Sequence, residues 1–69
     1  MTEKQRFLIY VHFAGLIACI RESNNVSISE AIKIMLEKGI IQKLEDLETG
    51  YYLESDGYLA ERFSLSSLG

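Results

Sequence analysis

Residues 7–20 read FLIYVHFAGLIACI, an almost unbroken apolar run of 14 residues. A membrane-spanning helix needs about 20 such residues, so this run is too short to cross a bilayer. On a helical wheel, at about 100° per residue, the run carries two apolar stripes. One stripe consists of Phe7, Val11, Ala14 and Ala18, and the other consists of Ile9, Phe13, Leu16 and Ile20. A helix that is apolar on two sides must be covered on two sides, which predicts a central helix over about residues 3–22.

A second helix over about residues 28–38 has the clearest start and stop signals. Ser27 and Glu30 read as a capping box, in which each side chain bonds the backbone N–H of the other residue. Gly39 suits the left-handed position that follows a helix end. Between these signals, apolar residues recur at the spacing of a core-facing helix: Ile28, Ala31, Ile32, Met35 and Leu36.

Downstream, we expect a short third helix over about residues 41–48, which Gly50 stops. Residues 51–65 allow two structures. Ser55 can cap a fourth helix over about residues 56–64, or the segments 51–53 and 58–60 can pair as a hairpin around Asp56 and Gly57. We favour the helix. The predicted fold is therefore all-α: a small three- or four-helix bundle around its N-terminal helix, with residues 1–69 forming one domain.

A chain of 69 residues buries only about 60% of the surface that its unfolded form exposes, so its stability is marginal. Cys19 is the only cysteine, which excludes an intrachain disulfide, and His12 is the only histidine, which excludes a His/Cys metal cage. We expect no metal and no cofactor. Association with another chain is the remaining means of stabilisation.

The charge distribution argues against nucleic acid as a partner. The net charge is −3, and residues 40–56 hold one lysine and five acidic residues, which would repel DNA from a helix-turn-helix centred on Gly39. A small DNA-binding regulator is nevertheless an alternative. An anionic membrane surface is disfavoured for the same electrostatic reason.

No constellation for catalysis is found, so we expect no enzyme activity. His12 and Cys19 are seven residues apart, which separates them by about 10 Å along a helix, too far for a nucleophile and its base. The acidic residues between positions 45 and 56 lack the Asp-x-Asp spacing of a calcium loop. The five glycines are scattered and form no phosphate-binding loop.

A bacterial lipoprotein is a further alternative, because Lys4 and Arg6 precede the apolar run and residues 16–19 read LIAC. Glu3 and His12 argue against it, since both place polar groups where a signal sequence avoids them. A lone cysteine fits a reducing compartment, and we expect a cytoplasmic protein.

Four residues are predicted to form an interface with a partner: Ile9, Phe13, Leu16 and Ile20. Leaving them in water would forgo about 1.5–3 kcal/mol each. The remaining helices are short, and we expect them not to cover both stripes of the first helix. The partner is expected to be a second copy, giving a dimer, or another protein.

Four segments together resemble a family of small uncharacterised bacterial proteins: residues 7–11, 28–31, 37–41 and 55–61, which read FLIYV, ISEA, EKGII and SDGYLAE. The resemblance implies an all-helical fold. Members are often encoded beside a domain that looks like an ADP-ribosyltransferase toxin, which implies an antitoxin-like or accessory role. Residues 51–54, YYLE, depart from the family's Leu-His-Thr-Gln-like stretch, so an activity that depends on that histidine is not expected here.

Overall fold

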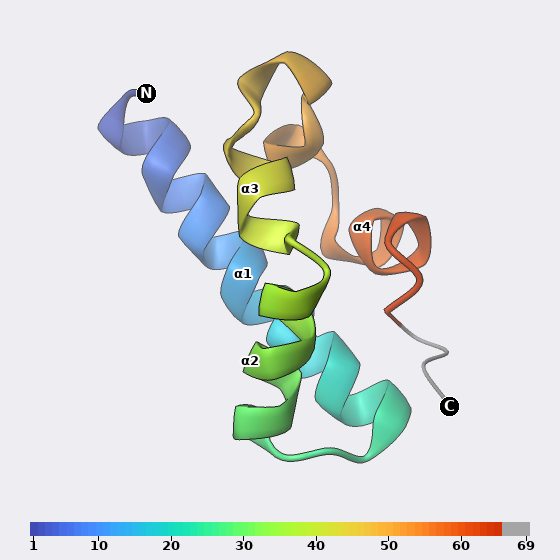
Figure 1. Cartoon of the computed structure of the whole chain (residues 1–69). Coiled ribbons are helices and arrows are strands. Elements are labelled where there is room, and N and C mark those ends of the chain that lie inside the picture. Colours follow the sequence, from blue (N-terminus) through green and yellow to red (C-terminus); the bar gives the residue numbers. More distant parts are fainter. Residues whose placement is uncertain (66–69) are drawn as a thin grey trace.

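The computed structural model describes residues 1–65, which form four α-helices (Figure 1). Their bounds are α1 Glu3–Asn24, α2 Ile28–Glu37, α3 Ile40–Glu45 and α4 Asp56–Arg62. Two 3-10 turns, Leu47–Thr49 and Tyr51–Leu53, connect α3 to α4. The described residues contain no strand. The all-α prediction is therefore confirmed, and the alternative hairpin around Asp56 and Gly57 is wrong.

Local signals explain both ends of α1. Thr2 and Gln5 form a capping box: the Thr2 hydroxyl accepts from the Gln5 backbone N–H at 3.1 Å, and the Thr2 N–H donates to Gln5 Oε1 at 2.9 Å. The helix continues past the predicted residue 22 to Asn24. It ends there because Asn25 adopts the left-handed conformation, with φ 54°.

The start of α2 and its junction with α3 lie where the sequence predicts, although among the described residues only the Ser27 half of the predicted capping box is formed. Ser27 caps α2 by accepting from the backbone N–H of Glu30 at 3.2 Å. Gly39 has a φ of 63°, a conformation that a residue with a Cβ rarely adopts, and the chain turns there into α3. This turn sets α3 beside α2 and returns both helices to α1.

The third helix is shorter than predicted, since α3 ends at Glu45 rather than near residue 48. Asp46 is extended, and its carboxylate accepts from the backbone N–H of Glu48 at 3.2 Å, which starts a separate 3-10 turn. The fourth helix is also shorter than the predicted 56–64. It is capped by Ser55 and ends at Arg62.

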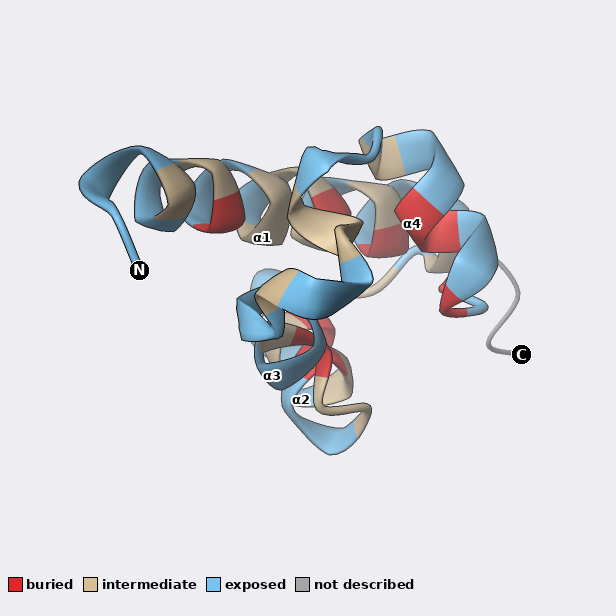
Figure 2. Ribbon diagram, turned by 90° about the horizontal axis from the view of Figure 1, so that it is seen from above, coloured by how far each residue is buried: buried red, intermediate tan, exposed pale blue. Residues whose placement is uncertain are grey.

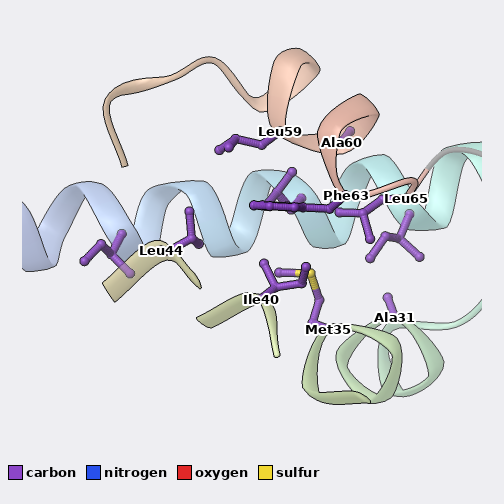
Figure 3. Close-up of a cluster of buried hydrophobic side chains, with 11 residues drawn as sticks. Ala31, Met35, Ile40, Leu44, Leu59, Ala60, Phe63 and Leu65 are labelled. Atoms are coloured by element: carbon purple, nitrogen blue, oxygen red, sulfur yellow. The ribbon is translucent and has the colours of Figure 1, made fainter. Parts of the chain in front are cut away.

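The core lies along one side of α1, which contacts all three other helices and the turn Tyr51–Leu53 (Figure 2). The buried apolar side chains come from every helix (Figure 3): Ile9, Leu16, Ile20, Ala31, Met35, Ile40, Leu44, Leu59, Ala60, Phe63 and Leu65. Within residues 1–65, no helix is both long and apolar enough to span a bilayer. The N-terminal helix is thus the element against which the rest of the fold is organised.

Candidate functional site

The predicted interface stripe is part of the core, which corrects the sequence analysis. Ile9, Leu16 and Ile20 are at most 1% exposed, and Phe13 is partly buried against them. Three helices, the turn Tyr51–Leu53 and Leu65 together cover this side of α1. Cover of that extent was not expected from short helices. We call this stripe of Ile9, Phe13, Leu16 and Ile20 the inner face.

The other apolar stripe of α1 is the exposed one. Phe7 is 64% exposed, Tyr10 61% and Val11 46%, and Ala14 and Ala18 continue the row along the helix. We call these five residues the outer face. Figure 2 shows exposed ribbon on the side of α1 that faces away from α2 and α3. Exposed apolar surface of this kind makes the outer face a candidate contact surface.

His12 joins α1 to the turn Tyr51–Leu53 and to the first residue of α4. Its Nδ1 atom lies 2.6 Å from Oδ1 of Asp56, and its Nε2 atom lies 2.7 Å from the backbone carbonyl oxygen of Tyr52. The two side chains are 14% and 37% exposed, so the contact is partly withdrawn from water. We call this arrangement the His12 clamp. It is not anticipated by the sequence analysis, because its partners lie 40 and 44 residues away.

The partners of His12 decide what the clamp can do. A carbonyl oxygen only accepts, so Nε2 must carry a hydrogen. The hydrogen bond between Nδ1 and the Asp56 carboxyl group then contains one proton. With the proton on Nδ1 the two side chains form an imidazolium–carboxylate pair, and with the proton on Asp56 both are neutral. A catalytic histidine leaves one ring nitrogen free for the proton that is transferred. Both ring nitrogens of His12 are engaged in these contacts. His12 therefore holds α1 against Tyr52 and Asp56, and neither nitrogen is left free to act as a catalytic base.

Gly15 makes the close approach of Asp56 possible. A Cβ atom at position 15 would collide with Oδ2 of Asp56 and would lie 2.8 Å from its Cγ atom. The Asp56 carboxylate therefore packs against α1 where Gly15 has no side chain, about one helical turn from His12. A glycine inside an apolar helix is a sequence signal for such an approach, although it does not name the residue that approaches.

Cys19 is unsuited to nucleophilic chemistry. Burial raises the pKa of its thiol above the ordinary value of 9.0, and the negative charges of Asp56 and Glu22 raise it further. The thiol is therefore protonated at neutral pH, whereas a reactive cysteine is a thiolate. No group of three or more potential metal-ligating side chains is found within residues 1–65.

The comparisons with known proteins add no function to this geometry. No protein-family model, curated protein or solved structure matches the chain. The outer face of α1 remains as an exposed row of apolar side chains on the helix that organises the fold.

Proposed function

We propose that this protein is a protein–protein interaction module that pairs with a second copy of itself through the outer face of α1. The row of exposed apolar side chains opposite the core is the observation that supports this proposal. It replaces the predicted inner-face contact by one on the opposite side of the same helix. A second copy is one of the two kinds of partner expected from the sequence, the other being a different protein.

The order of large and small residues favours an antiparallel pair. Phe7 and Ala18 are equally far from the midpoint of the outer face, and Val11 and Ala14 are equally close to it. A two-fold axis at that midpoint sets Phe7 against the partner's Ala18 and Val11 against the partner's Ala14. Large side chains then fill the space over small ones, as close helix packing requires. A parallel pair would instead place Phe7 against the partner's Phe7.

The charges that flank the outer face fit the same arrangement. Lys4 and Glu22 are both exposed and are five whole helical turns apart, so they lie on one flank, and Glu3 and Arg21 lie on the other in the same way. Antiparallel pairing brings Lys4 to the partner's Glu22 and Glu3 to the partner's Arg21. A hollow beside Ala18, lined in part by Arg21 and Glu22, lies where the partner's Phe7 would sit.

The exposed area sets the expected strength. Phe7, Tyr10 and Val11 are each about half exposed. Burying them in two copies would release roughly 5–9 kcal/mol, at about 1.5–3 kcal/mol for a fully buried side chain. Association itself costs about 4–15 kcal/mol. The gain exceeds the cost only at the favourable ends of the two ranges, by up to about 5 kcal/mol, so we expect a weak, reversible dimer with a Kd of about 0.2 mM or weaker.

Sedimentation equilibrium over a concentration series tests the proposal. Phe7→Glu places a charge in the contact and should weaken the dimer at least about tenfold. Leu36→Glu is the matched control, because Leu36 on α2 is 63% exposed and lies outside the outer face. It should leave the dimer unchanged. A wild-type chain that stays monomeric to millimolar concentration would contradict the proposal.

Charge exchange tests the antiparallel geometry separately. Lys4→Glu should weaken the dimer about twofold to tenfold, as exposed ion pairs do. Adding Glu22→Lys should restore it in an antiparallel pair, whereas a parallel pair would be restored by Glu3→Lys. Self-pairing would be overturned if the chain does not self-associate but binds a toxin-like enzyme encoded beside it, and if Phe7→Glu blocks that complex. The outer face would then be the binding surface for that enzyme.

A further inference from the structure

A second surface feature lies away from α1. An open hollow of about 270 Å³ is lined by Lys38, Lys43, Tyr51, Arg62, Phe63 and Ser64. Three of the chain's seven lysine and arginine residues therefore meet at one place, and the lining residues include no acidic side chain. The hollow is therefore positively charged, although the protein as a whole has a net charge of −3.

Two aromatic rings restrain two of the cations. The Lys43 Nζ atom lies 5.1 Å from the centroid of the Phe63 ring, and the Arg62 Cζ atom lies 6.0 Å from that of Tyr51. The rings themselves pack edge to face, with centroids 5.1 Å apart. Such cation–π contacts hold side chains that are otherwise mobile in solvent. Neither cation takes part in the ion pairs found among residues 1–65.

The helix ends explain only part of this charge. Lys38, Lys43 and Arg62 lie in or directly after the last turns of α2, α3 and α4, where the partial negative charge of a helix end attracts cations. Each end carries about half a negative charge, so three ends offset at most about 1.5 of the three positive charges. A positive charge of at least about 1.5 therefore remains available to an anion.

We propose that this hollow binds the phosphate group of a small molecule. A phosphate monoester carries about 1.5 to 2 negative charges at neutral pH, which matches the remaining positive charge, whereas a carboxylate carries only one. The Arg62 guanidinium can donate two parallel hydrogen bonds to phosphate oxygens, and the lysines supply point charges. Residues 40–56, with their net charge of −4 from one lysine and five acids, repel a long polyanion, so a small ligand is favoured over duplex DNA.

The test is a titration of the ¹⁵N-labelled full chain with inorganic pyrophosphate at constant ionic strength, followed by amide chemical shifts. We expect saturable shifts at Lys38 and Ser64. Lys43→Gln and Arg62→Gln should each weaken binding about fivefold to tenfold, since each removes a charged hydrogen-bond donor. Lys33→Gln is the matched control, because Lys33 is exposed, lies within 4.0 Å of Glu37 and is not part of the hollow.

Three results would overturn the proposal. Shifts that rise linearly and match those produced by sodium chloride would show only ionic screening. An equal loss of binding in Lys33→Gln would show a non-specific effect of net charge. Tighter binding of a short DNA duplex than of pyrophosphate, lost with Lys43→Gln, would assign the hollow to nucleic acid. Circular dichroism of each variant separates loss of binding from loss of fold.

Discussion

Both the inner and the outer face of α1 are apolar, but only the inner face is buried. The inner face carries Ile9, Leu16 and Ile20, which are almost completely buried, while the outer face carries Phe7 and Val11, which are largely exposed. The four inner-face side chains are all large and apolar, whereas two of the five outer-face residues are alanine. The two faces also differ in what lies beside them, because His12 and Gly15 border the inner face and give Asp56 a place to attach. The polar contacts of Asp56 thus lie on the side of α1 that is buried.

Truncation of one residue on each face tests this difference with the largest expected effect. Leu16→Ala should lower the free energy of unfolding by about 2–5 kcal/mol, because it opens a cavity in a fully buried site. Phe7→Ala should change the stability of the monomer by less than about 0.5 kcal/mol. Urea unfolding of the two variants at low protein concentration measures both values. Equal losses would mean that the faces are not distinct.

Gly15 lies at the boundary between the two faces, so its substitution tests the contact that Asp56 makes there. Gly15→Ala in a helix ordinarily stabilises by about 0.5–1 kcal/mol. Here it would displace Asp56 and cost a charged hydrogen bond of about 1.5–3 kcal/mol, so a net loss of about 1 kcal/mol is expected.

The sign should reverse once the carboxylate is gone. In an Asp56→Ala background, Gly15→Ala should stabilise the protein by about 0.5–1 kcal/mol. Urea unfolding of the four chains of this double-mutant cycle gives the coupling energy. The same effect in both backgrounds would show that Gly15 and Asp56 do not interact.

Cys19 gives the smallest effect, as a pH dependence. Its pKa is raised in the folded state, so the protonated thiol favours the fold fully below pH 9.0, and that contribution is lost as the pH rises through the folded pKa. Wild-type stability should therefore fall slightly more than that of Cys19→Ala between about pH 8 and 11. Parallel curves from chemical denaturation would contradict the raised pKa.

Local signals made most of the fold predictable. Ser27, Gly39 and Ser55 act within a few residues of their own positions, and each marks a helix boundary where the sequence places it. The end of α3 was misplaced because Asp46 can cap a new turn as readily as it can continue a helix, and only the backbone geometry distinguishes these outcomes.

The candidate sites were less predictable, because they depend on contacts between distant residues. A helical wheel identifies two apolar stripes on α1. Which of them is covered depends on where the turn Tyr51–Leu53 and α4 pack. The hollow joins Lys38, Lys43 and Arg62 from three helices, and a sequence in which acids outnumber bases gives no sign that these three meet.

The engagement of both ring nitrogens of His12 has a practical consequence. The chain contains one histidine, so its proton NMR spectrum contains a single set of imidazole resonances. The ring bonds to residue 52, in the turn Tyr51–Leu53, and to residue 56, the first residue of α4. That set of resonances therefore reports, without isotopic labelling, whether the last helix is attached to the first.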